Sequence, residues 1–241
     1  MPELPEVETI VRGLNACLPG KTVRRVEVRH PKPIRAHGAA VFRKLLAGKT
    51  FGPVERYGKF IQFHFTDGGG MIAHLRMTGK FISCVSPPPP FDPHIRLVFY
   101  LSDGALLFFK DMRLFGFVRV YGDGEHIREF KVLGKDPLRE SIAPEWFLER
   151  LRARRIPIKP LLLDQRILAG LGNIYASEAL FRARINPFMP AGELLRPHAT
   201  RLLKEIRSLL LLAVRHNGTS IRDFRDVSEQ SGGFQKMLRV Y

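Results

Sequence analysis

The chain has 241 residues, of which 45% are hydrophobic and 26% charged, proportions that exclude a disordered or fibrous protein. This length supports one or two domains with a sizeable hydrophobic core. Lysine and arginine number 39 against 23 aspartates and glutamates, so the net charge is +16. The expected partner is a polyanion, most often a nucleic acid.

The number of cysteines and the hydropathy of the sequence exclude further classes of protein. Cys17 and Cys84 are the two cysteines of the sequence, too few for a disulfide framework or a cysteine-rich metal site. No apolar run reaches the length of about 18 residues that a membrane span needs, and Met1–Glu8 lacks the order of a signal peptide. We expect a cytoplasmic monomer with reduced thiols, no membrane segment and no bound metal.

The N-terminal half is predicted to be one helix followed by short strands. Residues 3–16 carry apolar side chains at helical spacing, with a proline in the first turn. Between residues 22 and 121, segments 23–28 and 60–65 alternate in polarity, and segments 97–101 and 105–109 flank the turn Ser102-Asp103-Gly104. This density of strands and turns predicts a β-sandwich. Pro87–Pro90 is expected to form a stiff exposed loop.

The C-terminal half is predicted to be helical, with a boundary near residues 122–129. Amphipathic or leucine-rich helices are expected at 144–154, 173–183 and 198–216, and a mobile loop at Ser231-Gly232-Gly233. The sequence therefore indicates an α+β protein. Residues 1–122 would form a β-sandwich domain with its N-terminal helix, and residues 129–241 a helical domain.

The N-terminus offers a nucleophile. Removal of Met1 would make Pro2 the first residue, a secondary amine at a helix N-terminus, where the helix dipole disfavours its cation. Such an amine attacks electrophilic carbon and forms an iminium that keeps its positive charge without a proton. Glu3 and Glu6 lie beside it and are suited to proton transfer. Taken alone, the same residues are equally those of an ordinary helix start.

An ordered set of motifs resembles the bacterial formamidopyrimidine-DNA glycosylases, of the wider Fpg/Nei superfamily. The opening Met1-Pro2-Glu3-Leu4-Pro5-Glu6 is similar to that family's N-terminus. Further similar segments follow in the same order: Arg56-Tyr57-Gly58-Lys59, His74-Leu75-Arg76-Met77-Thr78-Gly79, Asp111-Met112-Arg113-Leu114-Phe115-Gly116, Ile158-Lys159-Pro160 and Gly170-Leu171-Gly172-Asn173-Ile174-Tyr175-Ala176-Ser177-Glu178. The last two segments together resemble the family's helix–two-turn–helix signature, which this resemblance assigns to the helical domain.

The resemblance implies a bifunctional DNA glycosylase and AP lyase of base excision repair, acting in the bacterial cytoplasm on double-stranded DNA. It would remove oxidised purines (8-oxoguanine and formamidopyrimidines) through a Schiff base on Pro2, then cut the strand by β,δ-elimination. By the same resemblance Glu3 is the proton donor and acceptor, Glu6 belongs to the catalytic set, and Lys59 lies near the reacting phosphate. No cofactor is implied for these steps.

The resemblance also implies a DNA-binding surface. Three residues would fill the space left by the everted base, and the others would contact the backbone or close over the lesion. Read singly, Met77 and Phe115 equally suit a hydrophobic core, Lys59 a surface, and each histidine a surface or a satisfied core position. The implied residues are Met77, Arg113 and Phe115 for filling; His74, His94, Arg113, Arg154, Lys159 and Asn173 for binding; and Gly218, Thr219, Ser220 and Phe234 for the lesion loop.

The sequence departs from the family at its end. Members normally continue beyond the position of Tyr241 into a zinc finger with four cysteines, but no Cys-x-x-Cys occurs here. We therefore expect either a truncated chain or a protein without the finger, and strand cleavage becomes an open question. Two alternatives stay open: an endonuclease-VIII-like glycosylase for oxidised pyrimidines, against which Leu4 argues, and a lesion-binding protein without catalysis.

Overall fold

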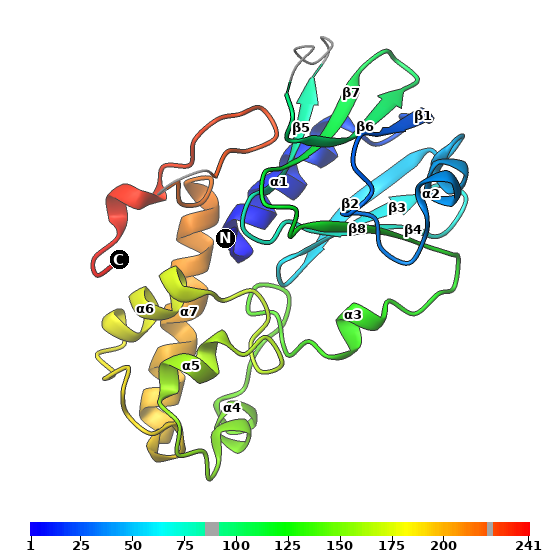
Figure 1. The fold of residues 1–241 in the computed structure, drawn as a ribbon. Coiled ribbons are helices and arrows are strands. Elements are labelled where there is room, and N and C mark those ends of the chain that lie inside the picture. Colours follow the sequence, from blue (N-terminus) through cyan, green and yellow to red (C-terminus); the bar gives the residue numbers. More distant parts are fainter. Residues whose placement is uncertain (85–91, 221–223) are drawn as a thin grey trace.

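The computed structural model describes residues 1–84, 92–220 and 224–241. It contains an α+β fold whose strands form the two sheets of a sandwich, as predicted (Figure 1). Every pairing between neighbouring strands is antiparallel. The first sheet has the order β1 (Val23–Val28), β6 (Ile95–Leu101), β7 (Leu106–Asp111), β5 (Gly79–Cys84), and the second β2 (Phe51–Tyr57), β3 (Phe60–Phe65), β4 (Gly70–His74), β8 (Phe117–Tyr121). The predicted loop Pro87–Pro90 lies outside the described residues.

Alternating burial explains the sandwich. In β3, Ile61, Phe63 and Phe65 point into the core while the residues between them are partly exposed. Phe63 meets Phe81 of the opposite sheet with ring centroids 5.2 Å apart. The side chains that the two sheets turn toward each other belong to one hydrophobic cluster, which holds the sheets face to face.

Helix α1 (Leu4–Cys17) joins this sandwich to the helices of the second half. Its buried residues Val7, Ile10 and Leu14 belong to the core of the sandwich, whereas Leu4 belongs to the helical core. The Leu4 amide also donates to the Gly170 carbonyl at 3.0 Å. Figure 1 shows the N-terminus beside the long helix α7 (Arg196–Arg215). The first turn of α1 is therefore fixed at the junction of two cores.

The second half is helical, as predicted, and α7 lies at its centre, with α4 (Pro144–Leu151) and α6 (Asn173–Arg182) packed against it (Figure 1). The predicted helix 144–154 ends early, at Leu151, because Arg152 is extended (ψ 135°) and Ala153 is left-handed (φ 58°). Sequence periodicity also missed three short helices, α2 (Ala39–Leu46), α3 (Arg128–Lys131) and α5 (Ile158–Leu163). The remaining elements are the 3-10 turns η1 (Ala191–Glu193) and η2 (Phe234–Met237).

None of the helices in the described ranges combines the length and apolar character that crossing a membrane requires.

Candidate active site

The predicted nucleophile and both predicted proton carriers lie at the N-terminal end of α1. Pro2 is half-buried and directly precedes Glu3, while Met1 before it is exposed. The Glu3 amide donates to Oε2 of Glu6 at 2.8 Å, which satisfies one of the free N–H groups of a helix start. Glu3 and Glu6 are both buried beneath the chain terminus. The structure thus brings these three residues together at one helix end.

Glu3 accepts hydrogen bonds from the N-terminus of α6. Its Oε2 accepts from the Gly172 amide at 2.7 Å and its Oε1 from the Ile174 amide at 2.9 Å. A Cβ at Gly172 would lie 2.4 Å from the Glu3 Cδ, so a side chain there is incompatible with this contact. The Gly-rich turn before α6 is therefore needed for the approach of Glu3.

Glu6 is held by groups from two other segments. Its Oε1 accepts from the Tyr175 hydroxyl at 2.5 Å and from the Thr219 amide at 2.8 Å. The Tyr175 and Thr219 hydroxyls are 2.9 Å apart, within hydrogen-bond distance. Sequence reasoning placed Tyr175 only inside a motif and assigned it no role. Its sole signal was that a tyrosine buried among apolar helix residues needs a polar partner.

Lys59 lies opposite these carboxylates and is buried, contrary to the surface position that a lysine after glycine suggests. Burial raises the pKa of Glu3 to about 7, and it also raises that of Glu6. The Lys59 charge opposes this rise at Glu3, and burial lowers the pKa of Lys59 itself. Glu3 therefore gains and loses a proton near neutral pH, as a general acid and base requires.

His74 is buried at the end of β4, and its Nδ1 accepts from the Arg76 amide at 3.0 Å. Burial and the neighbouring Arg76 charge lower the pKa of His74 to about 3, so its ring is neutral. Because Nδ1 accepts, Nε2 carries the hydrogen and is the available donor. His94 is half-buried near the start of β6, where its amide donates to Asp92 Oδ1 at 2.9 Å.

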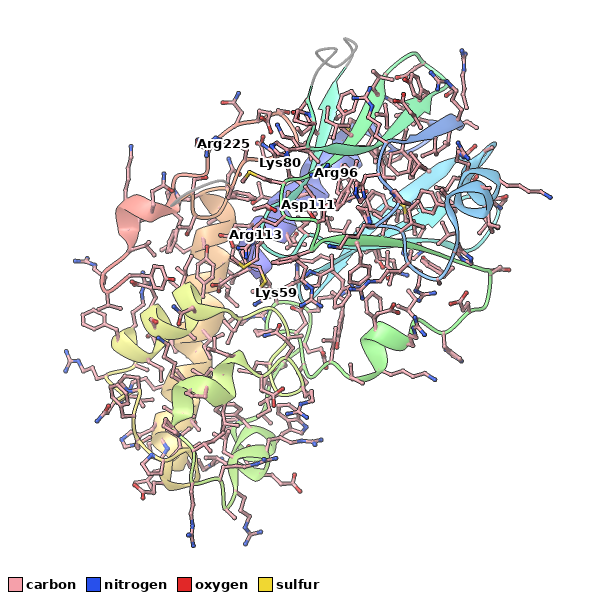
Figure 2. All side chains as sticks on the ribbon, viewed as in Figure 1. Lys59, Lys80, Arg96, Asp111, Arg113 and Arg225 are labelled. Atoms are coloured by element: carbon pink, nitrogen blue, oxygen red, sulfur yellow. The ribbon has the colours of Figure 1, made fainter. Side chains whose placement is uncertain are left out.

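The three predicted space-filling residues are exposed on two neighbouring loops. Met77 and Phe115 have 45% and 48% of their surface exposed, which excludes the core positions that their types suggest. The Arg113 guanidinium lies over the Phe115 ring, 4.7 Å from its centroid. Figure 2 shows Arg113 and Lys59 on the side where the sandwich meets the helical half.

A buried aspartate, which the sequence analysis did not single out, organises both loops. Asp111 is fully buried and accepts from the Thr78 hydroxyl at 2.5 Å and from the Gly116 amide at 2.8 Å. Its Oδ1 also accepts from the Arg113 amide at 3.2 Å. One carboxylate therefore fixes the loop after β4 and the loop after β7 relative to each other.

The helical half carries the remaining predicted DNA contacts. Asn173 is exposed at the first residue of α6, and its Nδ2 donates to the Tyr241 hydroxyl at 3.1 Å. Arg154 is exposed before α5, and Lys159 is half-buried within it. Lys159 borders a cavity of about 530 Å³ with Ser177 of α6. Lys159 therefore lies near α6 and Asn173 is exposed at its start, while the Gly172 and Ile174 amides there donate to Glu3.

The predicted lesion loop begins beneath Glu6. Gly218 and Thr219 are buried, while Ser220 is half-buried and donates through its hydroxyl to the Phe224 carbonyl at 2.9 Å. Phe234 is fully buried in the helical core, with its ring centroid 6.0 Å from that of Tyr175. The structure thus gives Phe234 a packing position, where the resemblance implied a loop that closes over a base.

The residues present do not fit the family's zinc site. The sequence has two cysteines, Cys17 at the end of α1 and Cys84 at the end of β5, against the four of the family's zinc finger. Within the described ranges, no group of three or more His, Cys, Asp or Glu side chains is arranged to hold a metal ion.

Comparison with known proteins matches both halves of the chain. The model of the formamidopyrimidine-DNA glycosylase N-terminal domain matches residues 1–118, and that of the glycosylase H2TH domain residues 133–225. Formamidopyrimidine-DNA glycosylases of Pelotomaculum thermopropionicum and Brevibacillus brevis are 44% and 40% identical to the chain. In each case the alignment covers the whole chain and 88% of the relative.

Solved structures agree with the sequence comparison. A Lactococcus lactis FPG mutant in complex with a Fapy-dG containing DNA has a TM-score of 0.92 at 33% identity. MutM in complex with carbocyclic 8-oxo-G containing DNA has a TM-score of 0.91 at 34% identity. Each alignment covers the whole chain and 88% of the solved one. The chain belongs to the formamidopyrimidine-DNA glycosylase family.

Proposed function

We propose that this DNA glycosylase of oxidised-purine repair removes 8-oxoguanine and formamidopyrimidines from double-stranded DNA through a Schiff base on Pro2, and then cuts the strand as an AP lyase. One observation carries the proposal. Glu3, with a pKa of about 7, lies directly beside Pro2 and faces Lys59, whose pKa burial lowers. A nucleophile needs a proton carrier in this position, whereas a protein that only binds DNA has no use for one.

The damaged base must leave the helix before Pro2 reaches the sugar, because the reacting carbon is covered in a stacked duplex. Met77, Arg113 and Phe115 suit the space that the base vacates, since they combine a flexible apolar chain, a donor for the orphaned partner base and a planar ring. The exposure of Met77 and Phe115 in the protein without DNA supports this assignment, because insertion needs side chains free of the core.

Contacts with the DNA backbone are expected from the positive charges and hydrogen-bond donors of the protein. His74, His94, Arg154, Lys159 and Asn173 supply donors or positive charge around the site, and the net charge of +16 supports phosphate binding in both halves. The related structures in complex with lesion-containing DNA support the same class of partner. DNA binding should therefore weaken steeply with salt.

The reaction starts once Met1 is removed and the Pro2 nitrogen is unprotonated. That nitrogen attacks C1′ of the sugar, and the base leaves with the electron pair of its glycosidic bond and takes up the proton that the amine loses. Glu3 then delivers a proton to the ring oxygen O4′ while the C1′–O4′ bond breaks, which opens the sugar and leaves an iminium between Pro2 and C1′. The resulting iminium acidifies the C2′ hydrogen, which a base removes, and the 3′ phosphate leaves by β-elimination. A second elimination releases the 5′ phosphate, and water then hydrolyses the iminium. These steps use the terminal amine and side chains alone.

Borohydride trapping tests the proposal. A duplex with one 8-oxoguanine opposite cytosine is incubated with the protein, with Pro2→Gly and with Glu3→Gln, and each sample is reduced. A covalent adduct in the parent that is lost in Glu3→Gln supports the proposal. Intact binding without an adduct leaves a lesion-binding protein, and an adduct only on oxidised-pyrimidine duplexes leaves the endonuclease-VIII-like alternative.

A further inference from the structure

The peptide that precedes Lys59 is held on both sides by buried charged groups. Gly58 occupies the left-handed region (φ 56°) in the turn between β2 and β3. Its amide donates to Oδ2 of Asp136 at 2.9 Å, and its carbonyl accepts from Nη1 of Arg56 at 3.1 Å. The backbone position from which the Lys59 side chain starts is therefore set by Asp136 and Arg56.

Asp136 connects the turn to the segment between the two halves of the chain. Its carboxylate is fully buried and binds both terminal nitrogens of Arg56. The same carboxylate accepts from the amides of Leu138 and Arg139 at 3.0 and 3.2 Å. Because each oxygen has several donors, Asp136 cannot shift without breaking contacts in both halves.

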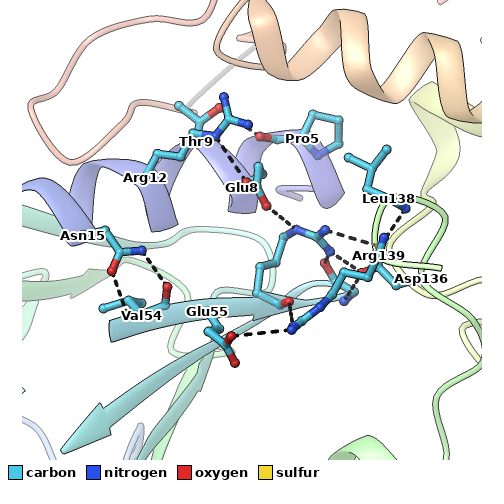
Figure 3. A network of polar contacts seen from close by, with 12 residues as sticks. Pro5, Glu8, Thr9, Arg12, Asn15, Val54, Glu55, Asp136, Leu138 and Arg139 are labelled. Atoms are coloured by element: carbon cyan, nitrogen blue, oxygen red, sulfur yellow. Dashed lines mark hydrogen bonds and ion pairs between the residues drawn. The ribbon is translucent and has the colours of Figure 1, made fainter. Parts of the chain in front are cut away.

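Arg56 extends the network to α1, the helix that begins directly after Pro2 and Glu3 and contains Glu6. Its Nε donates to Oε2 of Glu8 at 2.9 Å, and its carbonyl accepts from Arg139 at 2.7 Å. Figure 3 shows the labelled Glu8, Asp136 and Arg139 converging from α1 and from the segment before α4. The network therefore ties the Lys59 turn and the catalytic helix to the same buried carboxylate.

We propose that Asp136 and Arg56 are positioning residues for Lys59: they hold the Gly58 peptide so that the Lys59 ammonium stays buried against Glu3 and Glu6. This inference rests on the proposed function for its kinetic consequence. Both residues are buried and bind the turn, Glu8 and the segment at Arg139. They act by preventing the turn from swinging Lys59 outward, which a flexible lysine at a glycine turn would otherwise do.

The test combines Asp136→Asn with two readouts. Acylation of Lys59 in the DNA-free protein, followed by peptide mass spectrometry, measures its accessibility without any catalysis. Single-turnover base release is then measured in Asp136→Asn, Lys59→Gln and the double variant. Glu129→Gln is the matched control. Glu129 accepts from the buried Arg119 at 3.0 and 2.8 Å, in an ion pair that does not include the Gly58 turn.

Two results are expected. Lys59 is acylated at least about tenfold faster in Asp136→Asn than in the parent, as local opening of the turn requires, and at the parent rate in Glu129→Gln. Asp136→Asn slows base release about tenfold or more at an unchanged DNA dissociation constant, and the double variant is no slower than Lys59→Gln, because both changes remove one function.

Unchanged acylation of Lys59 overturns the inference, and so do rate losses that multiply in the double variant. If Asp136→Asn does not fold, Arg56→Lys answers the same questions, because an ammonium cannot bridge Asp136, Glu8 and the Gly58 carbonyl together. A parent without base release refutes the proposed function instead, and acylation alone then decides whether Asp136 positions Lys59.

Discussion

Replacing Glu3 with glutamine should change how stability depends on pH. The pKa of Glu3 is about 7 in the folded protein, against an ordinary value of 4.5. Between these values the folded protein keeps a proton that the unfolded chain has released. The stability that this proton contributes is present below pH 4.5 and is lost as the pH rises through 7. At 1.36 kcal/mol per pH unit, the loss is about 3 kcal/mol.

The glutamine at position 3 does not titrate, so the free energy of unfolding of Glu3→Gln does not fall through this cause. The difference between variant and parent should therefore move by about 3 kcal/mol in favour of the variant between pH 4.5 and pH 8. Urea denaturation of both proteins across this range measures the difference, in which the titration of other groups largely cancels. Glu193→Gln, which removes a carboxylate at an exposed position, is the control. A flat difference for Glu3→Gln would refute the raised pKa and with it the proposed proton transfer.

Three other substitutions test the packing of the site. Tyr175→Phe removes the hydroxyl that binds Glu6, and we expect a loss of about 1–3 kcal/mol in the free energy of unfolding, measured with urea. Asp111→Ala leaves loop donors unpaired, and we expect a loss of about 3 kcal/mol together with weaker DNA binding in a gel-shift assay. Gly172→Ala displaces Glu3, and we expect single-turnover base release to fall about a hundredfold in a folded protein.

Parental behaviour of Tyr175→Phe or of Gly172→Ala would contradict the prediction made for that variant. If Tyr175→Phe is as stable as the parent, the hydrogen bond from the Tyr175 hydroxyl to Glu6 makes no net contribution to the free energy of unfolding. Met77→Ala is the control for Asp111→Ala, because an exposed side chain should change stability by less than about 0.5 kcal/mol. Parental base release by Gly172→Ala would show that the contact between Glu3 and α6 is dispensable.

The sequence predicted the elements whose pattern is local. The alternation in residues 60–65 coincides with β3, and the apolar spacing of the first helix matches α1 within a residue at each end. The helix at 144–154 was too long because no proline or glycine marks the left-handed turn at Ala153. Short elements such as α2 offer too few residues for their periodicity to stand out.

The candidate site depends on contacts that no local pattern contains. Glu6 and Tyr175 are 169 positions apart, and Arg56 and Asp136 are 80 apart. Motif resemblance pointed to Glu6 and Lys59 but said nothing of their burial, which creates the pKa changes. Asp111 and Asp136 went unnoticed as individual residues, because an aspartate in a sequence looks exposed until its donors are known.

The central claim is that the attacking nitrogen belongs to Pro2, and Lys59 is the competing amine. Its pKa is lowered by burial and it faces the same carboxylates, so it too is able to form a Schiff base. Proteolysis of the borohydride-reduced adduct, followed by mass spectrometry of the modified peptide, separates the two. We predict the sugar remnant on Pro2 of a chain that has lost Met1. A remnant on Lys59, or an adduct formed by chains that retain Met1, would contradict the account.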